Sequence, residues 1–172
     1  MATSFDDLGS GSGAGAGVAD ATARDHDWPC LRQFCVFLEN RLGRLRDLLR
    51  IFEKHDLRII ALSINDSHDC ATARVMLSSY DRGREILSLS GFAYFESDII
   101  GVELPEGHQP FVMLCGSLLQ AEVNIHYTYP LLYSRQGRGA IAISVDDLDM
   151  ALKVLTELGH RLITEADLLS GE

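Results

Sequence analysis

The stretch from Leu31 to Leu62, LRQFCVFLENRLGRLRDLLRIFEKHDLRIIAL, decides the fold of this chain. It contains an apolar run, a polar turn ENRLGRL at 39–45, an amphipathic segment and a second apolar run. The same apolar pattern returns 66 positions later without a gap. Its apolar positions Val36, Leu38, Leu45, Leu48, Phe52, Leu57 and Ile59 recur as Val102, Leu104, Phe111, Leu114, Leu118, Val123 and Ile125. A period of this length indicates two copies of one small structural unit.

Composition limits the classes of protein that the chain can belong to. Its 172 residues are 47% hydrophobic, which is enough for one domain or two small ones with packed cores. The net charge of −10 and the pI of about 4.9 argue against a nucleic-acid partner or an anionic membrane, because both require a basic surface. No apolar run approaches the roughly 18 residues that a membrane helix needs. Four cysteines without metal-site spacing favour a reducing compartment, so we expect a cytoplasmic protein.

The first 29 residues differ from the remainder of the chain. The run GSGSGAGAG at 9–17 is low in complexity and too poor in apolar surface to offset the entropy of ordering it. We therefore predict a disordered tail over residues 1–29. The repeat divides the remaining chain into a first domain at 30–98 and a second at 99–172.

Apolar periodicity and turn residues predict the same elements in both copies. Strands are expected at 31–38, 58–64, 71–77, 92–98, 99–104, 123–129, 140–145 and 161–164, and helices at 40–55, 81–89, 110–120 and 146–158. Asn40 is expected to cap the first helix, with Leu42 on its apolar face. Two additional residues of the second copy are assigned to a loop at 130–139. The fold class is α+β: two ferredoxin-like βαββαβ units in tandem, with antiparallel sheets and the helices on one face.

This element order, the turn ENRLGRL and the later LRIIALS at 57–63 resemble the ACT domain. Residues 31–165 resemble tandem-ACT proteins that bind amino acids, and the first turn is also similar to that of the acetolactate synthase regulatory small subunit. The resemblance implies regulation by a small effector, usually an amino acid, bound where two ACT units meet. It implies neither a cofactor nor a metal.

The chemistry of the first turn is compatible with ligand binding. Gly43 lets a ligand approach the backbone, and the start of the helix offers free N–H groups at the positive end of its dipole. The side-chain amide of Asn40 could reach an α-amino or α-carboxyl group. The alternative is that Asn40 only caps the helix and Gly43 only eases packing.

The two copies differ at these positions, and the resemblance implies that each site takes its loop from one unit and its strand start from the other. One composite site then combines Asn40, Arg41, Leu42 and Gly43 with Asn124. The second site combines Arg58 with the loop that contains Glu106, His108, Gln109 and Pro110. It has no glycine at the equivalent position, and Pro110 removes an N–H donor, so we expect it to be degenerate.

The sequence supports a catalytic function less well than ligand binding. His68, Asp69 and Cys70 bring a base, an acid and a thiol together in sequence, but adjacent residues of a strand or turn point in different directions. The remaining histidines show no zinc-site spacing. We therefore expect a regulatory protein that is not an enzyme, that binds a free amino acid or similar small carboxylate, and that forms a homodimer. The alternatives are a regulatory subunit of an amino-acid biosynthetic enzyme such as acetolactate synthase and, more weakly, a small enzyme that depends on Cys or His.

Overall fold

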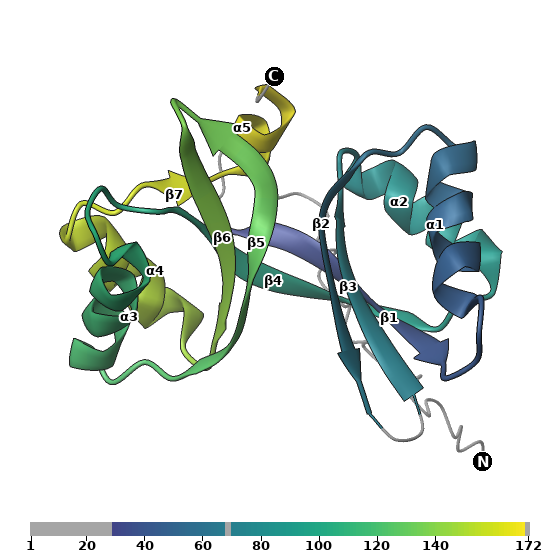
Figure 1. The fold of residues 1–172 in the computed structure, drawn as a ribbon, viewed down its shortest axis with the longest axis horizontal. Helices are drawn as coiled ribbons and strands as arrows, with labels where there is room; N and C mark the ends of the chain where they lie inside the picture. Colours follow the sequence, from purple (N-terminus) through teal and green to yellow (C-terminus); the bar gives the residue numbers. More distant parts are fainter. Residues whose placement is uncertain (1–28, 68–69, 171–172) are drawn as a thin grey trace, which may run out of the picture.

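The computed structural model describes residues 29–67 and 70–170. The predicted tail falls almost entirely outside these ranges. The elements are β1 (Leu31–Glu39), α1 (Arg44–Lys54), β2 (Ile59–Asp66), β3 (Cys70–Leu77), α2 (Tyr80–Ser90), β4 (Tyr94–Glu103), α3 (Pro110–Gln120), β5 (Ile125–Arg135), β6 (Arg138–Val145), α4 (Leu148–Glu157), β7 (Leu162–Ile163) and α5 (Glu165–Ser170). The predicted α+β class with two βαββαβ units is confirmed (Figure 1).

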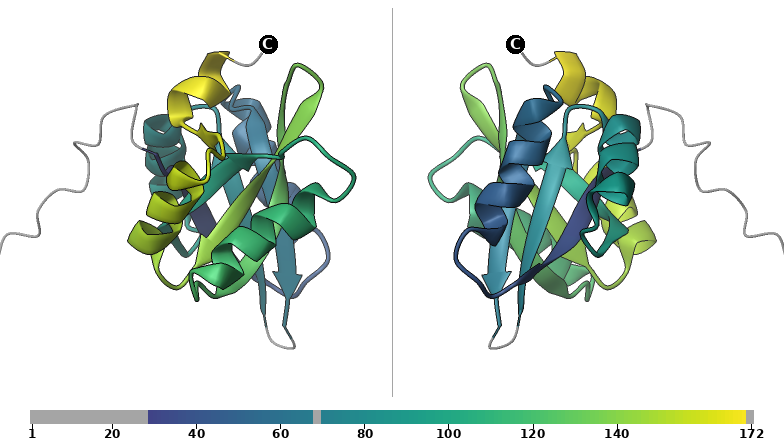
Figure 2. Two further views of the ribbon diagram at one scale, coloured as in Figure 1. Left: turned by 90° about the vertical axis from the view of Figure 1, so that its left-hand side faces the viewer. Right: turned by 90° about the vertical axis from the view of Figure 1, so that its right-hand side faces the viewer.

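Within the described residues the strands form one seven-stranded antiparallel sheet in the order β2-β3-β1-β4-β6-β5, with β7 paired to β4. The first unit comprises β1 to β3, α1, α2 and the first part of β4. The second unit comprises the rest of β4 and the elements that follow it. Each unit carries its two long helices on the outer face of its part of the sheet, as the two side views in Figure 2 show.

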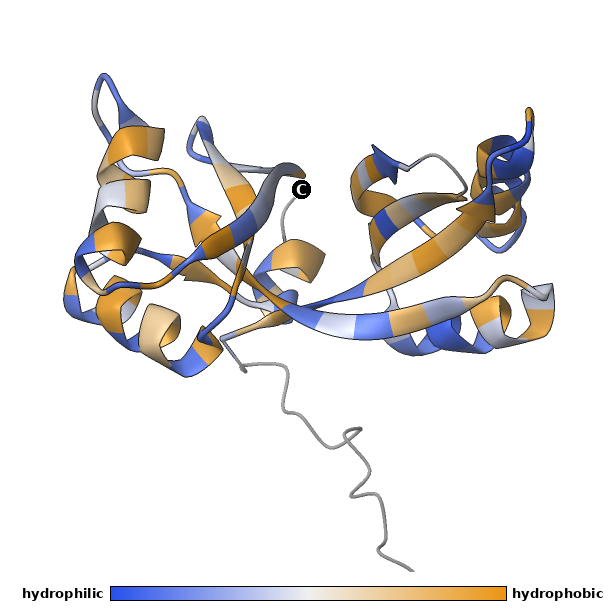
Figure 3. Cartoon of the chain, turned by 90° about the horizontal axis from the view of Figure 1, so that it is seen from below, coloured by the Kyte–Doolittle hydropathy of each residue, from blue (hydrophilic) through white to orange (hydrophobic). Residues whose placement is uncertain are grey.

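Strand β4 belongs to both units. Its residues 94–99 pair with β1, whereas residues 100–103 pair with β6. Seen from below in Figure 3, β1 and β4 run from one half of the molecule to the other. The two strands predicted at 92–98 and 99–104 are therefore one strand, because the turn-favouring residues Ser97 and Asp98 remain extended and pair with β1. The predicted domain division at 98/99 falls inside this strand.

Three apolar clusters hold the fold together. One lies between the sheet and the helices of the first unit, around Phe34 and Phe52, and the second lies in the same position in the second unit, around Leu114 and Ile143. The third cluster draws residues from both units and includes Leu31, Ile60, Met76, Ile99, Tyr129, Leu131, Ile163 and Leu168. The inner faces of the two halves of the sheet thus pack against each other, and neither unit completes this third cluster alone.

The structure corrects one local prediction and adds one element. Residues 130–135 belong to β5 rather than to a loop, and a register shift between Leu131 and Ser134 accommodates the irregularity. Pro130 is tolerated because β5 is the edge strand of the sheet. The helix α5 was not predicted, since its six residues are too few to show a helical period.

Candidate functional site

The helix α1 starts later than predicted. Gly43 is its N-cap residue, with a left-handed φ of 95°, and no side chain caps the helix. The prediction that Asn40 caps α1 is therefore wrong, since its amide Nδ2 donates instead to Asp66 Oδ1 at 3.4 Å. Leu42 was assigned to the apolar face of the helix, but it lies in the loop and is fully exposed, with a relative exposure of 107%. Glycine adopts this φ without the steric cost of a Cβ atom, and this explains the residue at position 43.

The β1–α1 loop exposes several backbone donors. The N–H groups of Leu42, Gly43, Leu45 and Arg46 have no acceptor among the described residues. They lie at the positive end of α1, where an anion is favoured. The guanidinium of Arg41 is held by its neighbour Glu39 through Nη2. The loop is therefore an open, donor-rich turn in which the backbone, rather than Arg41, offers the free groups.

The corresponding loop of the second unit has a different geometry. Gln109 is the N-cap of α3 with a φ of −134°, and Pro110 occupies the first helical position. Glu106 lies 3.7 Å from Arg138 in an ion pair, and His108 is exposed. The helix therefore starts from a residue with a negative φ, with one N–H donor fewer than α1.

The two strand starts, in contrast, make the same contacts. The Arg58 N–H donates to Ser78 Oγ at 3.1 Å, and the Ser78 N–H donates to the Arg58 carbonyl at 2.9 Å. The Asn124 N–H donates to Asp146 Oδ1 at 2.9 Å, and the Asp146 N–H donates to the Asn124 carbonyl at 3.2 Å. These bonds use the backbone of Arg58 and Asn124 and leave both side chains without a described partner.

A single chain does not bring the predicted composite site together. In Figure 1, along the longest axis of the molecule, the β1–α1 loop with Asn40 to Gly43 lies at the lower right and the α3–β5 loop with Asn124 at the lower left. The loop of the second unit and Arg58 are likewise contributed by different halves of the molecule. Assembly of either site therefore remains a prediction that requires a second copy of the chain.

A pocket of about 270 Å³ does occur inside one chain, and we call it the junction pocket. It lies between the first unit and α5, and its lining includes Leu31, Arg32, Met76, Tyr80, Glu165 and Leu168. Sequence reasoning missed it because one wall is α5. A signal was present in residues 164–167, TEAD, whose first and last residues have the spacing of a helix capping box.

Comparisons with known proteins agree with this architecture. The sequence profile of the ACT domain pair matches residues 30–170. The chain belongs to the ACT domain pair family. Family membership supports a regulatory role and favours it over catalysis. No curated protein matches the chain by sequence.

Three solved structures illustrate how far the likeness of this ACT pair extends. A Bacteroides thetaiotaomicron protein is similar at 26% identity and a TM-score of 0.75, over 82% of this chain and 96% of that one. The regulatory subunit of aspartate kinase from Thermus thermophilus shares the fold at 10% identity and a TM-score of 0.51, over 78% and 96%. The acetolactate synthase small subunit of Thermotoga maritima has 9% identity and a TM-score of only 0.36, over 77% and 92%, which supports no argument.

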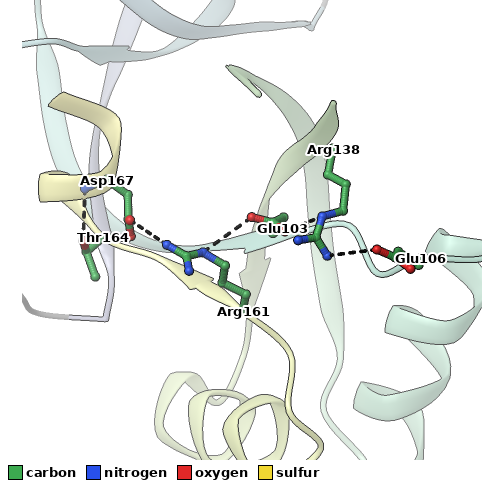
Figure 4. Close-up of polar contacts among 6 residues, drawn as sticks. All are labelled: Glu103, Glu106, Arg138, Arg161, Thr164 and Asp167. Carbon is green, nitrogen blue, oxygen red and sulfur yellow. Dashed lines mark hydrogen bonds and ion pairs between the residues drawn. The ribbon is translucent and has the colours of Figure 1, made fainter. Parts of the chain in front are cut away.

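Helix α5 joins the two ACT units through side chains. Glu165 accepts two hydrogen bonds from Arg32 of β1, both at 2.6 Å. Asp167 accepts from Arg161 at 2.8 Å and caps the helix start with Thr164, as Figure 4 shows. Burial raises the pKa of Asp167, but the bonds from Thr164 and Arg161 outweigh it, so the pKa lies below its usual value.

A buried carboxylate lies next to α5 in the second ACT unit. Glu103 is 3% exposed, and its two oxygens lie 2.9 Å from Arg138 Nε and 3.4 Å from Arg161 Nε (Figure 4). Arg161 thus bridges Glu103 and Asp167. A buried charge requires such partners, so this cluster has a structural explanation.

A second polar cluster lies between the ACT units. The buried Gln33 donates to the Tyr127 hydroxyl at 2.9 Å and accepts from the Tyr129 hydroxyl at 2.6 Å. Arg74 lies over the Tyr127 ring at 4.0 Å. Burial, followed by the neighbouring Tyr127 and Cys35, raises the pKa of Tyr129. These contacts specify how the two sheet faces meet.

The described residues include only one of the three catalytic candidates of the sequence and no metal cluster. No group of three His, Cys, Asp or Glu side chains within the described ranges could hold a metal ion. Cys70 is half-buried and lies 3.7 Å from Ser67 Oγ, while His68 and Asp69 lie outside those ranges. No helix in the described part of the ACT pair is long and apolar enough to span a membrane.

Proposed function

We propose that this ACT pair is a regulatory protein that binds a small effector, a free amino acid or a similar small carboxylate, where two ACT units meet. The observation that carries the proposal is the β1–α1 loop, with N–H donors on both sides of Gly43 that have no acceptor among the described residues. A carboxylate bound there would satisfy these donors and the positive end of α1.

The second half of the effector site comes from another copy of the chain. Because the β1–α1 and α3–β5 loops lie in opposite halves of the molecule (Figure 1), we propose a homodimer in which Asn124 of one copy faces Asn40 to Gly43 of the other. A two-fold axis would create two identical sites of this kind. The two second-unit loops would face Arg58 in the degenerate sites.

The surface of α3 supports a protein partner. Its residues 110–120 contain no charged side chain, and Phe111, Val112, Met113 and Leu119 are between 46% and 76% exposed. An exposed apolar face of this kind is typical of interaction surfaces. The same face favours a second candidate function, a regulatory subunit of an amino-acid metabolic enzyme. Sedimentation of the purified chain and co-purification of a catalytic partner distinguish the two.

A thermal-shift screen of the twenty amino acids identifies the effector. A ligand at 100 times its Kd should stabilise the fold by roughly 2.7 kcal/mol. If none of the twenty amino acids shifts the melting temperature, the effector is not a free amino acid. Small carboxylates without an amine are then the second panel, and failure of both panels contradicts the proposal.

Calorimetric titration of four variants tests the site. Asn40→Ala and Asn124→Ala should each weaken binding about tenfold or more, because each removes a hydrogen bond to a charged ligand. The matched changes Glu106→Ala and Arg58→Ala, at the equivalent positions of the other site, should have little effect. The opposite pattern would assign the effector to the second site. Gly43→Val, which would be informative if position 43 were helical, is a poor probe, since a β-branched residue at a φ of 95° would be strained.

A further inference from the structure

We propose that the junction pocket is a second ligand site, separate from the effector site at the β1–α1 loop, and that it binds a small aliphatic carboxylate. The carboxylate would bind Arg32, and the aliphatic part would lie against the apolar wall formed with α5. The site is complete within one chain, so it depends neither on a homodimer nor on the loop residues.

The pocket has a size and an apolar wall that suit a small aliphatic group. Its volume of about 270 Å³ lies just below the range of roughly 300–1,000 Å³ that drug-sized ligands occupy, and this argues against nucleotides and larger cofactors. Leu31 and Met76 are fully buried in its wall, and Ile60 is 5% exposed. Leu168 closes the wall from α5 and is 6% exposed.

Arg32 is held rigidly at the polar side of the pocket. Its Nε and Nη2 donate to the two carboxylate oxygens of Glu165, and its guanidinium lies 3.7 Å from the centre of the Tyr80 ring. Tyr80 is fixed in turn by stacking on Phe34, with 4.8 Å between ring centres. The hydrogen bond to Glu165 raises the pKa of Arg32 and outweighs its burial, so the cation is permanent. A charge fixed in this way is preorganised for an anion.

Arg32 retains donors for a ligand. A guanidinium has five N–H groups, and the fork to Glu165 uses two of them. Nη1 has no partner among the described residues, and Arg32 lines the pocket. The side chain as a whole is only 15% exposed. A carboxylate that reaches Nη1 would therefore share with Glu165 a cation that is largely shielded from water, and it would bind through directed, charge-assisted hydrogen bonds rather than through net charge.

Two kinds of molecule share this chemistry. Asp81 and Glu165 add two negative charges to the lining against the one positive charge of Arg32. An amino acid could place its ammonium group near these carboxylates, whereas a simple monocarboxylic acid could not. Both kinds of molecule need a carboxylate for Arg32 and an aliphatic group for the apolar wall. The experiment distinguishes amino acids from simple monocarboxylic acids.

The test is calorimetric titration of the full chain with leucine, with 4-methylpentanoate, which lacks the amine, and with 3-methylbutan-1-amine, which lacks the carboxylate. At least one of the two carboxylates should bind and the amine should not. Binding of leucine alone identifies an amino-acid site, and binding of 4-methylpentanoate as well identifies a general carboxylate site. Absence of binding by both carboxylates at millimolar concentration overturns the proposal, as does equal binding of the amine.

Variants of the ion pair then locate the site. Arg32→Gln should weaken carboxylate binding at least tenfold, whereas Glu165→Gln, which removes the anion that competes for Arg32, should leave 4-methylpentanoate binding unchanged or strengthen it. If the ion pair were purely structural, Arg32→Gln and Glu165→Gln would both weaken carboxylate binding. If Arg32→Gln does not fold, the Glu165→Gln result decides, and weaker binding in that variant contradicts the site.

Arg161→Gln is the matched control. It removes the other ion pair that anchors α5, to Asp167, without altering the lining of the pocket. Carboxylate binding at the junction pocket should persist in this variant. A loss in Arg161→Gln as large as that in Arg32→Gln would show that only the position of α5 matters. A loss in Asn40→Ala would assign the carboxylate to the loop site instead.

Discussion

The two ACT units make the same contacts where their strands begin and differ where their helices begin. The Arg58–Ser78 and Asn124–Asp146 pairs each exchange two hydrogen bonds in the same arrangement. Helix α1, in contrast, starts from the left-handed Gly43, whereas α3 starts from Gln109 and Pro110. The strand starts are constrained by the sheet in both copies, and the helix starts have diverged. Binding functions are therefore best sought at the helix starts.

The second pair of helices also differs at its start, in this case through a side-chain cap that neither α1 nor α3 has. The Asp147 carboxylate caps α4 by accepting from the Met150 N–H at 2.9 Å, whereas Ser79 leaves α2 without a side-chain cap. Ser79 also lines the junction pocket. In the first unit, both long helices thus begin without a side-chain cap, and each start borders one of the two proposed ligand sites.

The largest expected effect comes from separating the units. A fragment of residues 30–98 lacks the part of β4 that pairs with β6 and eight of the twelve buried residues of the third apolar cluster. We expect it to show no cooperative thermal unfolding by circular dichroism, because a domain of this size is marginal even with a complete core. The control is residues 29–172, which should unfold cooperatively. A fragment as stable as that control would show that the first unit folds independently.

The next effect concerns a glycine that only the second unit carries in its strand. A Cβ atom at Gly101 would lie 2.6 Å from Leu31 Cδ1 and 3.0 Å from Ile163 Cβ, whereas the equivalent position of the first unit is occupied by Cys35. Gly101→Ala should destabilise the fold by about 1–3 kcal/mol through overpacking. Gly116→Ala in α3, with no atom within 4 Å of the new Cβ, should stabilise it by up to about 1 kcal/mol. Urea denaturation measures both changes in unfolding free energy. Changes of the same sign in the two variants would contradict the packing argument.

The sequence predicts the framework well because both copies carry the same apolar spacing. The limits of α3 were predicted to the residue, and α4 ends at Glu157, one residue before the predicted limit. The failures have local physical causes. Strand β4 is continuous because it pairs with β1 over its first part and with β6 over its second. The sequence at Asp98 and Ile99 does not indicate either pairing. The candidate effector site was predicted as a set of residues, but sequence carries no distances, so the wide separation of Asn124 from the β1–α1 loop could not be foreseen.

A smaller effect compares the two helix caps. Asp147→Ala should cost about 1 kcal/mol of unfolding free energy, because the Met150 N–H loses its acceptor. Ser79→Ala should change stability by only a few tenths of a kcal/mol, since the Ser79 hydroxyl caps nothing. Thermal unfolding of the two variants at the same pH provides the comparison. A loss at Ser79 equal to that at Asp147 would mean that α2 is capped in solution and that the first unit does not differ in this respect.

The smallest effect is a pH dependence confined to the second unit, through the cap of α5. The pKa of Asp167 is lowered in the folded chain, so its ionised form stabilises the fold above the unfolded value of 3.8, and this contribution is lost as the pH falls through the lower folded pKa. Asp167→Asn should therefore cost less than about 1 kcal/mol at pH 7, a size typical of partly exposed pairs. The difference between wild type and variant should shrink as urea denaturation is repeated from pH 5 down to pH 2. Because Arg161 also contacts Glu103, Arg161→Gln should destabilise the chain more than Asp167→Asn at pH 7. A difference between wild type and Asp167→Asn that is independent of pH would show that the carboxylate contributes through its shape and hydrogen bonds rather than through its charge.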